Sequence, residues 1–377
     1  MTSAPQRQGR SFTPHSGKFR SVGPAGPVLV PGTYEGACLQ GMSELSRALG
    51  RHPEHHEELV RFLFQGWGHE AIAPAPRYPS QIGDDHSPFE YSLAFDPTGV
   101  ELRLLLEAQA IPASGHGNLQ AALRLNQRLA ESYGVHLRRF EAVQELFLSD
   151  PTAARFTLWH AVCLGPAGSP AFKLYLNPQA GGSERALQRI DEAMSRLGFG
   201  EVARRAVRAA MPRRGIDELG YFSLDLSAGL ESRVKVYIGH PDVSSHELDR
   251  VFEGFPSHRP GDVIDFCDVM SNGRGRFDRK PLMSCLSFVA GSELPKTVTL
   301  HLPIAHYVED DEQTFHRVRQ FLKREGLDHL AYERAMASVA RRPLVQGVGI
   351  QSYASFRREA GGLRFTAYLS PELFRAL

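Results

Sequence analysis

The chain has 377 residues, of which 42% are hydrophobic and 23% charged, and its formal net charge is +1 at pH 7. This composition is typical of a globular protein, and the length allows either two domains or one large barrel. The near-neutral charge and the lack of a basic block argue against nucleic acid as the main partner. No apolar run approaches the ~20 residues that span a bilayer.

Other coarse features narrow the class further. No apolar signal core begins the chain, so we expect a cytoplasmic protein without a membrane partner. The four cysteines are scattered, without the spacing of a metal site or a disulfide framework. We therefore expect neither a metal nor a cofactor, and small molecules as partners of a monomer or homodimer.

The N-terminal part predicts a tail, helices and a hairpin. Residues 1–30 are rich in Gly, Pro, Ser and Arg and are expected to form a mobile tail. A strand after Pro88, a turn ending at Gly99 and a second strand over 100–107 form a hairpin signal. Asp84-Asp85 could suggest a magnesium site, but further spaced acids are missing and a capped turn is favoured.

The rest of the chain alternates strand pairs with helices. The predicted strand pairs are 155–162 with 172–177, 221–226 with 233–238, 284–289 with 297–302, and 349–356 with 364–369. The predicted helices cover about 34–49, 54–65, 117–134, 138–148, 184–197, 200–210, 244–254, 310–325 and 328–341.

One strand pattern returns four times, with a ring-bearing residue at Tyr175, Tyr237, His301 and Tyr368. The steps of 62, 64 and 67 residues are nearly constant, which indicates a repeated supersecondary unit. The first hairpin looks like a fifth, degenerate copy of the unit. We therefore expect residues 31–377 to form a single domain of five helix–strand–strand–helix units. The expected fold class is α+β, with ten antiparallel strands.

Each repeated strand has one apolar and one polar face. Ten such strands close naturally into a barrel, which removes the sheet edges. Helices outside would cover the apolar face. Because such a barrel is wider than the eight-stranded kind that side chains just fill, its solvent-accessible lumen can hold a ligand.

The polar face carries five cations and four tyrosines. Two of the chain's six lysines share one register of the repeat. One interpretation is an ordinary outward face of the sheet, on which long side chains extend their charged ends into water. If the face lines a lumen, the cations suit a diphosphate and the rings suit a carbocation. The cations are Arg103, Lys173, Arg233, Lys235 and Arg364, and the tyrosines are Tyr175, Tyr237, Tyr353 and Tyr368.

Over about residues 34–377 the sequence resembles the dimethylallyltryptophan synthase type of aromatic prenyltransferases. The resemblance rests on the segments 87–92, 103–107, 173–175 and 233–237, with Tyr353 and Tyr368. It implies the αββα prenyltransferase barrel and catalysis without a metal. It further implies transfer of a dimethylallyl group from dimethylallyl diphosphate to the indole ring of L-tryptophan.

The resemblance also implies residue roles. Glu90 matches the glutamate that accepts the indole N–H. Arg103, Lys173, Arg233 and Lys235 match diphosphate ligands, beside Arg364 on the same polar face. Tyr175, Tyr237, Tyr353 and Tyr368 match the tyrosine shield around the carbocation.

Two departures from the family pattern involve histidines. Thr299 and His301 replace a common Gln and Tyr, so His301 is expected in an altered shield. His160 falls near a lysine that in some members helps to remove the ring proton, and it is a plausible general base. A satisfied structural histidine is the equal alternative for His160.

Other functions stay open at this point. Another aromatic acceptor, namely tyrosine, a tryptophan-containing cyclic dipeptide or a simple indole, would use the same barrel. A non-catalytic binder of an anionic aromatic ligand would use the same cations and rings, although it would gain nothing from Glu90 near the cations.

Overall fold

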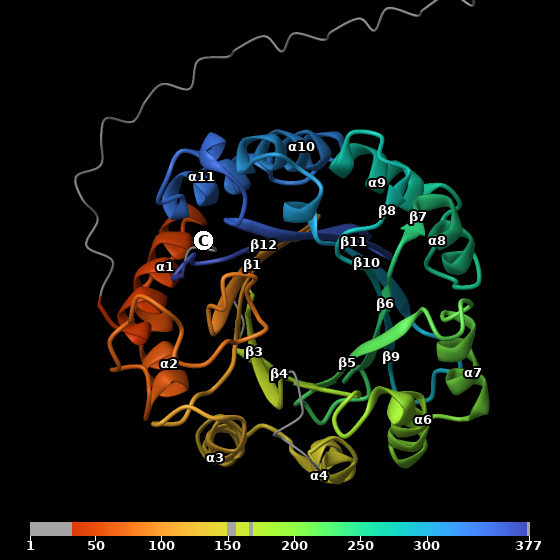
Figure 1. Ribbon diagram of the computed structural model, residues 1–377, viewed down its shortest axis with the longest axis horizontal. Helices are drawn as coiled ribbons and strands as arrows, with labels where there is room; N and C mark the ends of the chain where they lie inside the picture. The colour runs from red at the N-terminus through yellow and green to blue at the C-terminus, as the bar shows by residue number, and fades with distance from the viewer. Residues whose placement is uncertain (1–31, 149–155, 166–168, 375–377) are drawn as a thin grey trace, which may run out of the picture. The chain divides into compact units, whose positions relative to one another are not determined.

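The protein is described by a computed structural model that covers residues 32–148, 156–165 and 169–374. The predicted tail over 1–30 lies outside these residues. Ten strands form a closed antiparallel barrel, as Figure 1 shows in a view through its centre. The predicted fold class is therefore confirmed.

The barrel consists of five hairpins. Their strands are β1 (Phe89–Asp96) with β2 (Gly99–Leu106), β3 (Leu158–Leu164) with β4 (Ala171–Leu176), β5 (Glu218–Asp225) with β6 (Val234–His240), β9 (Leu282–Phe288) with β10 (Thr297–Leu302), and β11 (Gln351–Glu359) with β12 (Gly362–Leu369). Pairing of β1 with β12 closes the ring, with Ser92 opposite Tyr368.

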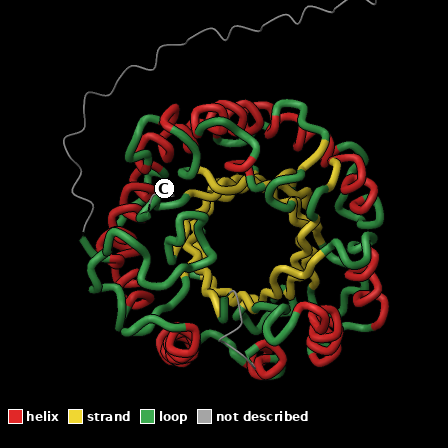
Figure 2. Tube along the Cα trace, in the orientation of Figure 1, coloured by secondary structure: helices red, strands yellow, loops and turns green. Residues whose placement is uncertain are grey.

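Helices surround the barrel as an outer layer (Figure 2). The helices are α1 (Tyr34–Ala48), α2 (Glu54–Phe64), α3 (Gly115–Tyr133), α4 (Arg138–Glu141), α5 (Gln144–Phe147), α6 (Ala186–Arg196), α7 (Glu201–Ala209), α8 (Ser245–Phe252), α9 (Asp262–Ser271), α10 (Asp311–Arg324) and α11 (His329–Val339). None of the helices in the described part combines the length and the apolar composition needed to cross a membrane.

Two parts of the helical layer differ from the sequence-based expectation. The predicted helix over 138–148 is split into the short α4 and α5, and α9 was not predicted. A two-stranded sheet of β7 (Val243–Ser244) and β8 (Arg276–Phe277) brackets α8 and α9.

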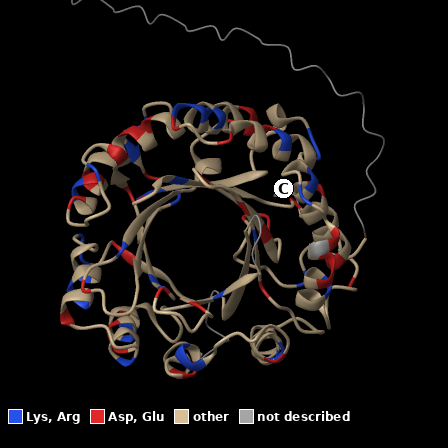
Figure 3. Ribbon diagram, turned by 180° about the vertical axis from the view of Figure 1, so that it is seen from behind, with Lys and Arg blue, Asp and Glu red and all other residues tan. Residues whose placement is uncertain are grey.

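The two-residue period of the strands divides polar from apolar side chains. On β6, the outward Val234 and Val236 are fully buried beneath the helices, whereas Lys235 and Tyr237 line the lumen. The outward side chains join one continuous hydrophobic core between barrel and helices. Charged residues of both signs are spread over the outer helices (Figure 3). The apolar contact between the two layers therefore fixes the wall that carries the polar lumen.

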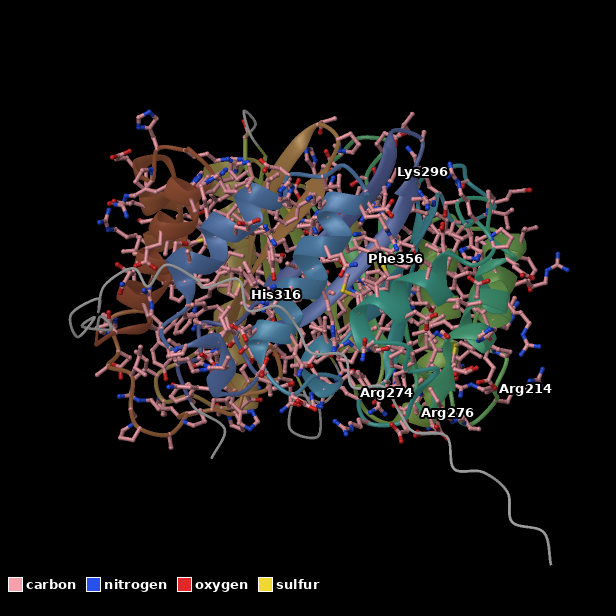
Figure 4. All side chains as sticks on the ribbon, turned by 90° about the horizontal axis from the view of Figure 1, so that it is seen from above. Arg214, Arg274, Arg276, Lys296, His316 and Phe356 are labelled. Atoms are coloured by element: carbon pink, nitrogen blue, oxygen red, sulfur yellow. The ribbon has the colours of Figure 1, made fainter. Side chains whose placement is uncertain are left out.

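The hairpins give the barrel two different ends. Every first strand of a hairpin begins at one end, which we call the mouth, and every hairpin turn lies at the other, which we call the far end. In the side view of Figure 4, Lys296 of the β9–β10 turn lies at one edge, and Arg274 and Arg276 near β8 lie at the opposite edge.

A buried carboxylate fixes the start of β11. Asp311, at the first position of α10, accepts hydrogen bonds from the backbone N–H groups of Ile350 at 3.1 Å and Gln351 at 3.0 Å. It also pairs with the buried Arg342 at 2.6 Å. Because β11 contributes side chains to the mouth, this contact ties the helical layer to the wall of the lumen.

We expect Asp311→Ala to lower the free energy of unfolding by about 3 kcal/mol, since it removes the acceptor of two buried N–H groups and a buried ion pair. Urea denaturation measures this change. The control is Glu333→Ala, whose ion pair with Arg319 is more exposed and should matter by less than about 0.5 kcal/mol. Equal effects of the two changes would contradict the role of Asp311.

Candidate active site

The lumen contains two cavities that meet at a waist. The inner cavity lies toward the far end, and the outer cavity opens at the mouth. Both are lined by the same six residues, which we call the waist: Glu90, Leu105, Tyr175, Tyr237, His301 and Tyr368. A ligand in one cavity therefore meets a ligand in the other at these side chains.

The inner cavity is cationic. Arg103, Lys173 and Lys235 line it from β2, β4 and β6, because each lies on the inward parity of its strand. Arg103 is paired with Glu101. Neither lysine ammonium group has a hydrogen-bond or ion-pair partner among the described residues, although the lysines are only 6% and 8% exposed.

Burial acts against the charge of both lysines. It lowers the pKa of Lys173, and burial together with the neighbouring Arg233 and Lys173 lowers the pKa of Lys235 well below its usual value. Buried cations are ordinarily paired, so an anion in the inner cavity would relieve a cost that the empty protein carries.

Arg233 and Arg364 lie one step nearer the far end and do not line the inner cavity. Arg233 pairs with Asp225 at 2.7 Å and faces a separate cavity at the far end. Arg364 pairs with Asp96 at 2.8 Å and with Glu101 at 3.0 Å. The five predicted cations thus share one side of the barrel wall, but only three of them reach the inner cavity.

Sequence reasoning missed a fourth cation of the inner cavity, Arg357 on β11. It pairs with Glu359 and stands directly opposite Arg364 in the sheet. Tyr353 and Ser355 lie on the inward face of the same strand, and the two-residue alternation places Arg357 on that face too. The signal was therefore present in the sequence.

A row of rings forms the waist and continues to the mouth. The ring centres are 5.8 Å apart for Tyr175 and Tyr237, 5.6 Å for Tyr237 and His301, and 5.9 Å for His301 and Tyr368. Tyr353 continues the row, 6.1 Å from Tyr368, and lines only the outer cavity. Four of these rings come from the second strand of a hairpin, which explains their regular spacing.

Glu90 enters the waist from the start of β1 and is 5% exposed. The Ser352 hydroxyl donates a hydrogen bond to its carboxylate. Burial raises the pKa of Glu90 to about 8, against the opposing effects of that hydrogen bond and of Lys280. The carboxylate is thus held beside both cavities in a weakly solvated position.

The prediction of His160 as a base in the lumen is wrong. Trp159 and Ala161 occupy the inward parity of β3 and line the outer and inner cavities. His160 therefore points outward, where its Nε2 contacts the amide oxygen of Asn126 on α3 at 2.8 Å. Burial lowers the pKa of His160 to about 3. His160 is thus a buried structural histidine, held through Nε2, although its Nδ1 has no hydrogen-bond partner among the described residues.

The outer cavity has an aromatic wall that the repeat did not predict. Trp159 stacks on Phe156 with ring centres 4.1 Å apart, and Tyr221 lies 5.4 Å from both. All three line the outer cavity beside Tyr175. Such a wall offers flat faces to a planar aromatic ligand.

A charged cluster stands at the mouth, where three loops meet. Asp84 pairs with Lys280 and lies 2.7 Å from Nε2 of His306. Burial alone would raise the pKa of Asp84, but His306 and Lys280 hold it well below its usual range. Lys280 also lies 4.9 Å above the Tyr353 ring. Asp85, in contrast, caps a turn by accepting from the backbone N–H of Ser87 at 3.0 Å.

Comparison with known proteins identifies the class of this barrel. A profile of the tryptophan dimethylallyltransferase family matches residues 43–253. The fold is similar to that of 6-dimethylallyltryptophan synthase from Micromonospora olivasterospora, solved with DMASPP and Trp, with a TM-score of 0.85 and 31% identity over 91% of this chain and 98% of that one.

Two further solved structures are similar. The 5-dimethylallyl tryptophan synthase from Streptomyces coelicolor, also solved with DMASPP and Trp, has a TM-score of 0.84 and 27% identity over 92% of this chain and 97% of that one. The prenyltransferase PriB, solved with L-tryptophan and dimethylallyl thiolodiphosphate, has a TM-score of 0.82 and 27% identity over 91% and 97% of the two chains.

The unpaired lysines predict a binding preference. We expect Lys173→Ala and Lys235→Ala each to weaken the binding of inorganic diphosphate by about 10- to 100-fold, the usual effect of losing a hydrogen bond to a charged group. Titration calorimetry gives the affinities. Lys296→Ala is the matched control, because Lys296 lies at the far-end rim and pairs with the exposed Glu231. Equal weakening in all three variants would show that the lumen is not the site.

Proposed function

The chain belongs to the tryptophan dimethylallyltransferase family and is an aromatic prenyltransferase, and from this premise we propose that it transfers the dimethylallyl group of dimethylallyl diphosphate to the indole ring of L-tryptophan. The observation that carries the proposal is the pair of cavities joined at the waist. A cationic inner cavity and an aromatic outer cavity suit the two substrates, and Glu90 lies where they meet.

The inner cavity would hold the diphosphate and stabilise its negative charge. Lys173 and Lys235 can each donate to diphosphate oxygens without first leaving a carboxylate partner. Arg103 and Arg357 stand beside them and can turn toward the same anion. Charge on the leaving group grows as the C–O bond breaks, so these cations stabilise the transition state more than the bound substrate. Arg233 and Arg364, which lie one step nearer the far end, would add positive charge behind these four side chains.

The row of rings would surround the allyl cation. Each aromatic face stabilises a nearby cation by roughly 0.5–2 kcal/mol. Tyr175, Tyr237 and Tyr368 occupy the waist, directly above the inner cavity, with His301 among them. Tyr353 extends the row toward the acceptor. The same rings keep water away from the cation, which favours prenyl transfer over hydrolysis.

Glu90 would activate the acceptor. An indole that attacks the allyl cation builds positive charge on its ring, including at the nitrogen. The hydrogen bond from the N–H group to the carboxylate becomes stronger as that charge grows. A non-catalytic binder of an anionic aromatic ligand has no use for this carboxylate beside the cations.

The mouth favours a free amino acid as acceptor. The Asp84 carboxylate can accept from an α-ammonium group, and Lys280 can donate to an α-carboxylate, so the two together suit a zwitterion. A simple indole lacks both groups, and a cyclic dipeptide has converted both to amides. Tyrosine has the zwitterion but lacks the ring N–H that Glu90 would accept. Three similar enzymes were solved with tryptophan, which agrees with this choice.

Incubation with dimethylallyl diphosphate and a panel of acceptors in EDTA tests the function. We expect L-tryptophan to be prenylated fastest, and activity to stay within a few-fold of that without EDTA, because the proposed diphosphate ligands are side-chain cations only. Mass spectrometry detects the product and NMR assigns the carbon. Complete loss in EDTA that only magnesium restores would contradict the metal-free clamp, and a faster reaction with another acceptor would contradict the choice of tryptophan.

Glu90→Gln should lower turnover by about 100-fold and change the Km for tryptophan little, since the charge acts mainly in the transition state. Because burial raises the pKa of Glu90 to about 8, the ionised form prevails only above that pH. The wild-type kcat/KM for tryptophan should therefore fall as the pH drops below about 8, and the variant should lack this limb. A rise in Km alone would make Glu90 a mere binding contact.

A further inference from the structure

Aromatic prenylation has to remove one proton from the ring, and the residue expected to take it lies outside the lumen. His160 contacts α3 behind the barrel wall, as described above. The proton acceptor must instead reach the place where the allyl cation and the acceptor ring meet. Under the proposed function, that place is the waist.

The waist offers few groups that can accept a proton. Leu105 is apolar, and the three tyrosines are neutral phenols, because burial raises the pKa of each. Glu90 is engaged by the ring N–H. The remaining side chain is the imidazole of His301. We propose that His301 is the base that accepts the ring proton, beyond its place in the row of rings; this inference rests on the proposed function.

The contacts of His301 leave one ring nitrogen open. Its Nδ1 lies 3.3 Å from the hydroxyl of Tyr368, and that hydroxyl also interacts with Ser355. In the tautomer that the proposed role uses, Nδ1–H donates to the Tyr368 oxygen and Nε2 carries the free lone pair. Nε2 has no hydrogen-bond partner among the described residues. The imidazole lines both cavities, so this nitrogen is accessible to a ligand at the waist.

The surroundings keep this imidazole neutral. Burial, together with Lys235, Arg357 and Arg103, lowers the pKa of His301 to about 3. A protonated ring beside these cations would also repel the allyl cation. A neutral imidazole is nevertheless basic enough, because the prenylated ring cation is a far stronger acid. Diphosphate in the inner cavity would offset the three cations and stabilise the imidazolium once it forms.

The position of His301 also separates it from Glu90. Glu90 enters from β1 and His301 from β10, which stand three places apart around the barrel. The indole N–H and the C–H bond that breaks belong to different atoms of the ring. Two acceptors on different strands can therefore serve both bonds at once.

The step balances without another reactant. A ring carbon forms a bond to C1 of the allyl cation, and the ring carries the positive charge. The C–H bond at that carbon then breaks, its electron pair restores the aromatic ring, and the proton moves to Nε2 of His301. The imidazolium returns to neutrality by giving the proton to the departing diphosphate or to water.

Kinetics with tryptophan deuterated on the indole ring carbons test this role without knowledge of the carbon attacked. We expect no isotope effect in the wild type, where proton loss follows the rate-limiting step. His301→Phe keeps an aromatic ring but removes the base. It should lower turnover by about 100-fold or more and reveal a normal isotope effect, since the ring cation then reverts before it loses the proton.

Two further variants keep the test decisive. His301→Tyr places in this repeat the ring found at 175, 237 and 368, so it preserves the wall of the waist and should show the same isotope effect. His301→Gly opens a space for imidazole, and added imidazole should restore part of the turnover. His160→Gln is the matched control outside the barrel and should show no isotope effect. Binding of dimethylallyl thiolodiphosphate, followed by thermal shift, reports whether each variant retains a folded inner cavity.

Turnover within a few-fold of the wild type in His301→Phe or His301→Tyr, without an isotope effect, would overturn the proposal and assign the proton to the diphosphate. Failure of imidazole to restore turnover in a folded His301→Gly would also count against it. Failure of the proposed function is distinguishable, because the wild type itself would then prenylate no aromatic acceptor.

Discussion

Two buried lysines without partners are the constraint on which the site depends. Each arginine of the inner cavity, and each arginine one step nearer the far end, is paired with a carboxylate. Lys173 and Lys235 stand among these pairs with no counter-charge of their own. An anion of matching charge is thus the missing component of the lumen. A bound diphosphate would fix the reacting end of the prenyl group on the inner-cavity side of the waist.

The period of a strand arranges the rest along the barrel axis. Two residues separate Arg233, which directly precedes β6, from Lys235, and two more lead along β6 to Tyr237 at the waist. The same step on β10 leads from Thr299 to His301. β4 repeats this order with Lys173 and Tyr175, and β12 carries Thr366 before Tyr368. The rings thus form one level, and the two lysines with Arg103 and Arg357 lie on the inner-cavity side of it. Leaving group, cation and nucleophile can then line up along one axis. The apolar contact with the outer helices holds these levels in place.

The repeat predicted ten strands and the face of the two lysines, because strand periodicity and register are local properties of sequence. The strand that carries His160 was predicted, but the predicted role needs His160 on the inward face of that strand. The inward face instead carries the neighbouring Trp159 and Ala161. Arg357 followed the expected alternation and was overlooked. The cluster at the mouth had no local signal, since Asp84 lies 196 residues from Lys280 and 222 from His306. Only the closed barrel brings these loops together.

Proton uptake on binding of dimethylallyl thiolodiphosphate tests the central claim most directly. Burial and neighbouring cations lower the pKa of both lysines, and a bound anion should raise it again. Calorimetry at a series of pH values below the ordinary lysine pKa, in buffers of different ionisation enthalpy, should therefore show protons taken up by the wild type. Lys235→Arg keeps a cation that is always charged, so it should bind the analogue with less uptake. Tight binding with no uptake in the wild type, or equal uptake in the variant, would contradict the account.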